Sequence, residues 1–267
     1  MTNNTINLYF GDDLSLYREI PVSVNEFITN PHYIGEYTKN GANVFPFWKD
    51  VLNTIFRPDY KKRCIVASTD YNTGKTEFCN IALAYILYLF MCLKNPQEFF
   101  KFIETDTMLI TLCDPDSIQY NYIFEIIRKS MWFQVHGVLN INENNFIESY
   151  KAFDNNIILQ KVQCEDDMLG KQVVSGSFIW TIREDTEDIF NTYQAFSARI
   201  QSRSCINGTL YGFVFVDIER DFGRAPREYG WHCPNDLVTI IDDSSYDTRI
   251  TPDVMGGVRY KERFGVF

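Results

Sequence analysis

The chain has 267 residues, a length that suits one large α/β domain or two small ones. Hydrophobic residues make up 45% of it and charged residues 22%, a globular composition that excludes an intrinsically disordered chain. The formal net charge of −10 disfavours non-specific wrapping of nucleic acid, although it leaves room for a local basic edge.

The cysteine and apolar patterns predict an intracellular protein. The seven cysteines are an odd number without a C-x-x-C pair, which is typical of reduced thiols in a cytosol. The three histidines are not grouped with cysteines, which argues against a zinc site. The N-terminus lacks the basic start and apolar core of a signal peptide. The densest apolar run, 81–93, has 13 residues and predicts a buried helix rather than a membrane span.

Strands and helices alternate along most of the chain. Residues 1–44 are polar and mixed, and we expect an N-terminal arm or a loose helical lid there. Apolar residues at helical spacing then predict a helix over 47–56, and a short apolar run predicts a buried strand over 63–68, followed by a helix over 75–93. The other strands are expected at 107–113, 156–162, 177–182, 209–216, 237–241 and 263–267, and the other helices at 95–103, 116–131 and 188–202. This alternation predicts an α/β fold with a mostly parallel sheet and helices on both faces.

A polar turn between the strand at 63–68 and the helix at 75–93 ends in Gly74, Lys75 and Thr76. A buried strand, a turn and a helix beginning with GKT form the pattern of a phosphate-binding loop (P-loop, or Walker A motif). Gly74 would let the backbone approach the phosphates, Lys75 would bridge the β- and γ-phosphates of ATP, and Thr76 would ligate Mg²⁺. We expect the Lys75 side chain to be exposed and to face a cavity at the head of the helix.

The loop departs from the pattern at two positions. Thr69 stands where the first glycine of a P-loop is expected, and Asp70 places a negative charge close to the phosphates. The residues predicted to bind the nucleotide are Thr69, Asp70, Tyr71, Asn72, Thr73, Gly74, Lys75 and Thr76. The alternative is a polar turn that binds no ligand.

Several stretches resemble the large terminase subunit of tailed phages, the ATP-driven motor that packages DNA into a prohead. The resemblance covers most of the chain. It is carried by NVFPFWKDVLNTIF (43–56), RCIVASTDYNTGKTEFCNIALAYILYLFMCLKNPQEFF (63–100), DDMLGKQVVSGSFIW (166–180), YQAFSARIQSR (193–203), GTLYGFVFV (208–216) and DTRITPDVMGGVRYKERFGVF (247–267).

The resemblance implies a P-loop NTPase fold with a terminase-like core of the ASCE class, in which 45–267 is the ATPase domain. It implies ATP and Mg²⁺ as ligands and double-stranded DNA, the portal or prohead and the small terminase subunit as partners. A homo-oligomeric ring in the cytoplasm of the host cell is the assembly that it implies. In the family, a nuclease domain with clustered acids follows the ATPase half. We expect none in this chain, which stops at Phe267, and no DNA cleavage.

The resemblance also assigns roles to single residues. Phe47 and Trp48 match the aromatic element that lies near the adenine in such motors, and the alternative for both is a place in the core. The strand that carries the family's catalytic acid pair matches 177–182, but the alignment places Trp180 and Thr181 at the pair.

The next acids after that strand are Glu184 and Asp185. A slip of two or three residues in the alignment would make Glu184 the general base and bring Asp185 to the Mg²⁺ shell. The alternative is that these acids, with Glu187 and Asp188, stabilise the N-terminus of the following helix.

Two arginines near the end of helix 188–202 are candidates for contacts in trans or with DNA. Arg199 and Arg203 could contact phosphate or act as an arginine finger on a neighbouring subunit. The alternative is that they only stabilise the C-terminal end of their helix. The strand that follows ends in Phe215, Val216 and Asp217, where the family carries a small hydroxylated pair.

Two other functions remain open at this point. One is a degenerate terminase-like module that binds a ligand or has a structural role but has lost hydrolysis. Two features favour such a module: no acid stands at the aligned pair, Trp180 and Thr181, and the loop before Gly74 carries the acid Asp70. The other is an unrelated P-loop ATPase or kinase, against which the upstream aromatic element and SARIQSR count.

Overall fold

An eight-stranded sheet organises the computed structural model, which describes residues 8–69, 74–113, 122–141, 147–162, 171–180, 186–219 and 238–243. Its strand order is β10-β1-β9-β6-β2-β5-β4-β3. The strands are β1 (Cys64–Thr69), β2 (Met108–Cys113), β3 (Gly137–Ile141), β4 (Ile147–Ala152), β5 (Ile157–Val162), β6 (Gln172–Trp180), β9 (Val214–Glu219) and β10 (Val238–Asp243). All pairs from β10 to β5 are parallel, and β4 and β3 add an antiparallel edge. The prediction of a mostly parallel α/β sheet is confirmed.

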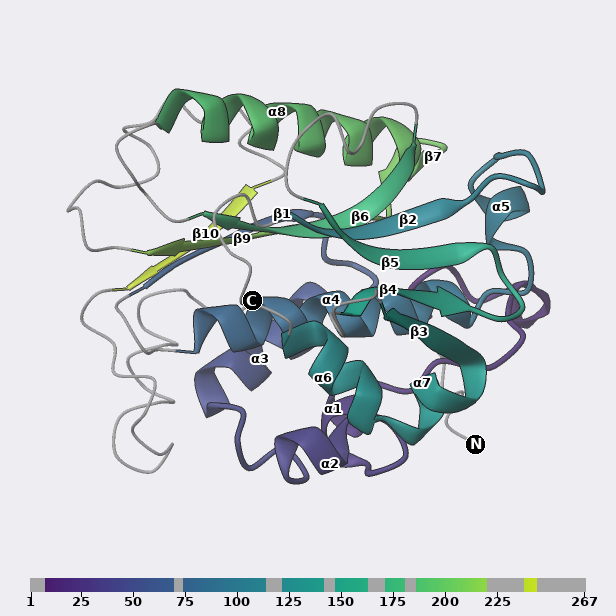
Figure 1. The fold of residues 1–267 in the computed structure, drawn as a ribbon, viewed down its shortest axis with the longest axis horizontal. Coiled ribbons are helices and arrows are strands. Elements are labelled where there is room, and N and C mark those ends of the chain that lie inside the picture. The colour runs from purple at the N-terminus through teal and green to yellow at the C-terminus, as the bar shows by residue number, and fades with distance from the viewer. Residues whose placement is uncertain are drawn as a thin grey trace.

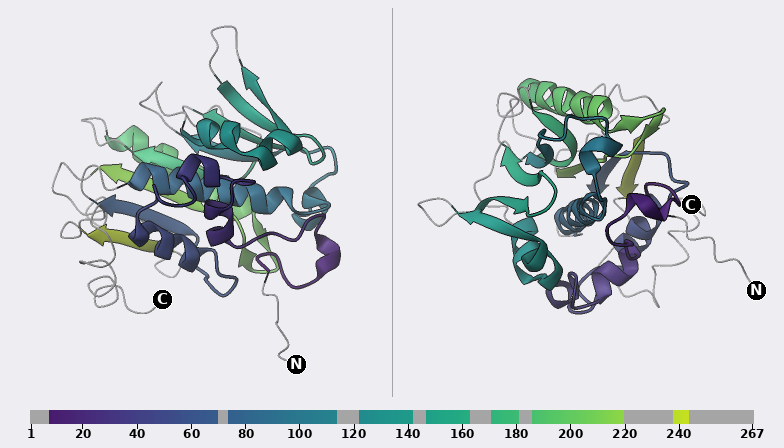
Figure 2. Two further views of the ribbon diagram at one scale, coloured as in Figure 1. Left: turned by 90° about the horizontal axis from the view of Figure 1, so that it is seen from below. Right: turned by 90° about the vertical axis from the view of Figure 1, so that its right-hand side faces the viewer.

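Helices cover both faces of this sheet (Figure 1). Helix α8 (Thr186–Arg203) lies on one face, and α4 (Lys75–Met91) lies on the other. Further helices pack on the side of α4 that faces away from the sheet. The sheet therefore lies between α8 on one face and, on the other, α4 with these helices (Figure 2, right). The remaining helices are η1 (Leu14–Leu16), α1 (Val24–Thr29), α2 (Gly35–Thr38), α3 (Pro46–Ile55), α5 (Pro96–Phe99), α6 (Tyr122–Lys129) and α7 (Met131–His136).

Helix α4 is the centre of the hydrophobic core. Its 17 residues are apolar nearly all round, and 15 of them are buried. A helix without a polar face has to be covered on every side, here by the sheet and by the outer helices. The sequence prediction of a buried helix is confirmed. In the described part of the chain, no helix is both long and apolar enough to cross a membrane.

The N-terminal segment is part of the same core, where an arm or loose lid was expected. Phe27 of α1 is fully buried, and its ring lies 5.1 Å from the rings of both Tyr85 and Tyr88 of α4. Tyr17 forms an isolated bridge with Leu93, just beyond the end of α4. The helices of this segment have six residues or fewer, so their few apolar residues left no periodic pattern in the sequence.

Several element boundaries differ from the prediction. The helix expected over 116–131 ends at Lys129, because Ser130 caps a separate helix, α7, by accepting a hydrogen bond from the Phe133 amide. The strand expected over 209–216 is divided into β8 (Thr209–Leu210), which pairs with β7 (Cys205–Ile206), and β9. The β3–β4 hairpin was not predicted. The strand expected over 263–267 lies outside the described residues.

Buried phenol and thiol groups predict a loss of stability at high pH. Burial raises the pKa of Tyr85, Tyr88 and Cys92 above their ordinary values of 10.0 and 9.0, and it raises the pKa of Tyr17 to about 12. Above about pH 9 the unfolded chain therefore binds fewer protons than the folded one, and the free energy of unfolding falls by about 1.4 kcal/mol per pH unit for each ionised group. Urea unfolding should show full stability at pH 8 and a steep decrease between about pH 9.5 and 11. Tyr85→Phe should make this decrease shallower, and a flat profile would contradict the expectation.

Candidate functional site

The carboxyl end of β1 and the N-terminus of α4 meet at one edge of the sheet. β1 ends at Thr69, and residues 70–73 lie outside the described residues, so the predicted contacts of Asp70, Tyr71, Asn72 and Thr73 stay predictions. Gly74 is the N-cap of α4 and has φ 85° and ψ 14°. The predicted order of strand, turn and helix is confirmed for the elements on either side of the loop.

Gly74 fills a position that other residues cannot take without strain. Its positive φ belongs to the left-handed region, which glycine adopts without the steric cost of a Cβ atom. A Cβ atom would also lie 2.9 Å from a ring carbon of Phe45 and 3.3 Å from Nε1 of Trp48. The start of α3 therefore packs directly on the start of α4, which joins the aromatic element to the GKT sequence in space.

The aromatic pair next to Gly74 is part of the core. The exposed fraction of Phe47 is 3% and that of Trp48 is 1%. Trp48 stacks on Phe78 of α4, with ring centroids 4.5 Å apart and an angle of 23° between the planes. This packing supports the core alternative for both residues. Contact of Phe47 or Trp48 with an adenine stays a prediction, and the half-buried ring of Phe45 also lies against Gly74.

Replacing Trp48 should destabilise the fold more than it changes ligand preference. Trp48→Ala removes a fully buried indole, which typically costs about 3–5 kcal/mol, whereas Trp48→Phe retains part of the stack on Phe78. Urea unfolding should rank wild type above Trp48→Phe and Trp48→Ala. Where the variants remain folded, they should lose affinity equally for ATP and for inorganic triphosphate. A selective loss of ATP with unchanged stability would instead identify Trp48 as a contact of the base.

Lys75 and Thr76 occupy the first turn of α4. Lys75 was expected to be exposed, but only 6% of it is, so this expectation was wrong. Thr76 is half-buried, and its hydroxyl donates a hydrogen bond of 2.5 Å to Oδ2 of Asp217. Because Lys75 is buried, its side chain contributes to packing as well as charge, and a substitution there would affect both.

Asp217 is the polar residue that the sequence reasoning did not assign to the site. It lies on β9, is 3% exposed and pairs in register with Ala67 of β1. In the sequence it was only the end of a strand that departed from the family pattern. A single acid inside the apolar run Phe213–Ile218 is the signal that could have identified it, because a buried carboxylate needs compensating partners.

The pKa of the Cys79 thiol, one turn into α4, depends on polar groups from several elements. Burial raises the pKa of Cys79 well above its ordinary value, and the negative charge of Asp217 acts in the same direction. The neighbouring hydroxyl of Ser177 on β6 and the charge of Lys75 act in the opposite direction. Lys75, Asp217 and Ser177 therefore all lie close enough to Cys79 to influence its ionisation.

The two predicted acids follow β6 in the sequence. Glu184 and Asp185 lie outside the described residues, so their roles as base and metal ligand stay predictions. Helix α8 begins at Thr186, directly after them, which also fits the alternative that acids stabilise this helix N-terminus. β6 itself contains no acidic residue and ends at Trp180.

The two candidate arginines lie on α8, on the face of the sheet opposite to α4 (Figure 1). Arg203 is exposed in the last turn of α8, where a positive charge is favourable for the helix dipole. Arg199 lies one turn earlier and is half-buried. Their contacts with DNA or with a neighbouring subunit stay predictions.

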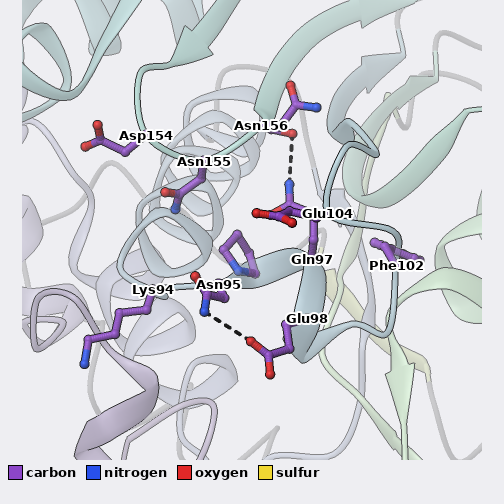
Figure 3. A pocket seen from close by; sticks show the side chains of 10 residues that line it. Lys94, Asn95, Gln97, Glu98, Phe102, Glu104, Asp154, Asn155 and Asn156 are labelled. Carbon is purple, nitrogen blue, oxygen red and sulfur yellow. Dashed lines mark hydrogen bonds between the residues drawn. The ribbon is translucent and has the colours of Figure 1, made fainter.

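A cavity of about 570 Å³ lies at the other end of α4, beside α5 (Figure 3). Its buried amide groups are used for structure: Asn155 donates to the carbonyl oxygens of Met91 and Leu93, and Gln97 donates to that of Asp106. The two Asn155 bonds fix the end of α4 to the turn between β4 and β5. The cavity is therefore separate from the GKT end of the helix.

Comparisons with known proteins give a distant similarity to a solved structure. No family model matches the chain, and no curated protein matches it. A solved structure of the large terminase from a thermophilic bacteriophage superposes with a TM-score of 0.43 and 10% sequence identity, over 81% of this chain. The match covers 50% of that protein, so the chain spans about half its length. This similarity is confined to the fold and is too distant to carry an argument about function.

Proposed function

We propose that the junction of β1 and α4 binds the triphosphate of ATP together with Mg²⁺. The observation that carries the proposal is the left-handed Gly74, which opens α4 directly beyond β1 and is followed by Lys75 and Thr76 in the first turn. The first amides of a helix have no partners within it, and its dipole favours negative charge at this end. A 17-residue helix that begins in this way is suited to bind phosphate.

The residues at the junction fit a magnesium nucleotide. Gly74 carries no side chain where the backbone would meet the phosphates, and Lys75 supplies a positive charge at the same end of α4. The Thr76 hydroxyl and the Asp217 carboxylate supply the oxygen ligands that Mg²⁺ prefers. Bound Mg²⁺ would neutralise phosphate charge and position the γ-phosphate. Among the described residues no cluster of three or more His, Cys, Asp or Glu side chains could hold a metal, so phosphate oxygens would complete its shell.

The finer proposal is that the chain is the ATPase core of a DNA-packaging motor of the large-terminase type. Its support is the set of sequence stretches on either side of the GKT, which resemble that family, and the order of strands and helices, which agrees with the expected core. In this function Glu184 would accept a proton from the attacking water. Double-stranded DNA, the portal and the small terminase subunit would be partners, and the subunits would form a ring.

Calorimetric titration with ATP tests the binding proposal, and phosphate release tests hydrolysis. We expect ATP to bind more tightly with Mg²⁺ than with EDTA, and inorganic triphosphate to compete with it. Hydrolysis should require Mg²⁺ and should increase when double-stranded DNA is added. Absence of ATP binding with Mg²⁺ present, in protein shown to be folded, would contradict the proposal.

A second candidate function is a nucleotide-binding module that has lost hydrolysis. The observation in its favour is that β6 has no acidic residue along its length and ends at Trp180. It predicts binding of Mg²⁺ and ATP without turnover, even when DNA and the portal are present. Turnover above background would exclude it.

A further inference from the structure

We infer that Asp217 of β9, with Thr76, is the protein group that holds Mg²⁺ at this site. The resemblance assigned the metal carboxylate to Asp185, which follows a different strand. The inference rests on the proposed function, because the ion would be shared with the phosphates of the bound nucleotide. It concerns which strand supplies the carboxylate.

The surroundings of Asp217 are built to hold a buried carboxylate. It is 3% exposed, and removing a carboxylate from water costs several kcal/mol unless its environment compensates. Two features compensate here: the Thr76 hydroxyl donates to Oδ2, and the positive end of the α4 dipole lies at the same place, where Lys75 occupies the first turn. A buried carboxylate in direct contact with Thr76 is therefore a candidate metal ligand.

A bound triphosphate would bring further negative charge to the same helix end. Two anions close together in a poorly solvated site repel each other strongly, because the effective dielectric constant there is low. A divalent cation between them changes this repulsion into attraction on both sides. Mg²⁺ is typically held by one or two carboxylates together with substrate phosphates, and in P-loop enzymes by the loop Ser or Thr and an acid. The direct contact of Thr76 with Asp217 brings these two protein ligands together.

The strand order places Asp217 beside the strand that leads into the GKT sequence. β9 is inserted between β1 and β6, so the end of β6 lies one strand further from β1, which is about 4.8 Å in a sheet. Asp217 is level with Ala67 of β1, two residues before β1 ends at Thr69. Asp217 therefore reaches the N-terminus of α4 from the strand adjacent to β1.

Magnesium dependence of nucleotide binding, measured on separate variants, tests this inference. The probe is a fluorescent, non-hydrolysable ATP analogue, titrated in EDTA and in Mg²⁺, and the direct metal readout is the EPR signal of Mn²⁺ with the analogue present. Asp217→Asn should keep the affinity for the ATP analogue measured in EDTA, or increase it because a negative charge is lost. It should lower the affinity for Mn²⁺ by at least about tenfold. Asp154→Asn, which removes an exposed charge beside the cavity at the other end of α4, should match wild type.

Asp185→Asn and Thr76→Ala complete the experiment. Asp185→Asn should leave Mn²⁺ affinity near the wild-type value, and a loss there with no loss in Asp217→Asn would overturn the inference. If circular dichroism shows Asp217→Asn to be unfolded, Asp185→Asn decides which strand supplies the carboxylate, and a loss of about tenfold in Mn²⁺ affinity there would overturn the inference. Thr76→Ala tests the second protein ligand in a variant that keeps the helix, since alanine is favourable there. Thr76→Ala should lose Mn²⁺ affinity, and unchanged affinity would overturn the inference. Wild type that binds no analogue in either buffer would overturn the proposed function, and the inference with it.

Discussion

Lys75→Met should weaken the binding of ATP with Mg²⁺ by about 10- to 150-fold. Hydrogen bonds to charged groups contribute about 1.5–3 kcal/mol each, and about 1.36 kcal/mol corresponds to a factor of ten in affinity. Methionine is the better replacement because Lys75 is 6% exposed, and alanine would leave a cavity as well as remove the charge. Calorimetric titration with ATP and Mg²⁺ measures the loss.

Two controls separate loss of charge from loss of fold. Lys94→Met removes an equal charge from an exposed lysine beyond the other end of α4, and it should bind ATP like wild type. Thermal unfolding should show that Lys75→Met remains folded. Wild-type affinity for ATP in folded Lys75→Met would contradict the assignment of the phosphate site.

Glu184→Gln should lower ATP turnover by about 10²- to 10⁴-fold while ATP binding is retained. Glutamine keeps the size and hydrogen bonding of glutamate but cannot accept the proton of the attacking water, and loss of a general base typically has an effect of this size. The measurement is the rate of phosphate release with saturating ATP and Mg²⁺, with DNA present.

Glu187→Gln is the matched control for Glu184→Gln. Glu187 lies in the first turn of α8, where an acid stabilises the helix by about 0.3–1 kcal/mol. If both acids only stabilise this helix end, the two variants should lose similar, small amounts of stability and neither should lose turnover. If turnover survives Glu184→Gln, Glu184 is not the general base and another acid has that role.

The elements with strong periodic patterns were predictable from the sequence. The apolar run of α4 and the short apolar strands β1, β2 and β5 were placed to within a few residues, because burial dictates their composition. The segment 8–44 was not, since its apolar residues follow no sustained helical or strand period, and their packing depends on α4. The β3–β4 hairpin was missed because its strands alternate weakly and lie at the sheet edge.

The candidate site was predictable only where its residues are adjacent in the chain. Gly74, Lys75 and Thr76 form a local motif, and the structure places them at the expected helix start. The contact between Thr76 and Asp217 joins residues 141 positions apart and depends on β9 lying beside β1. Strand order is a property of the folded sheet, and a single sequence does not contain it. The burial of Lys75 and Trp48 likewise depends on tertiary packing, in which α3 lies against the start of α4.

The most direct test of the nucleotide site is an experimental structure with a non-hydrolysable ATP analogue and Mg²⁺. The triphosphate should lie at the N-terminus of α4, with its phosphates over Gly74 and the Lys75 ammonium in contact with them. Mg²⁺ should bind between the phosphates, the Thr76 hydroxyl and Asp217. An analogue bound elsewhere on the protein, or a loop that binds no phosphate at saturating analogue, would contradict the account.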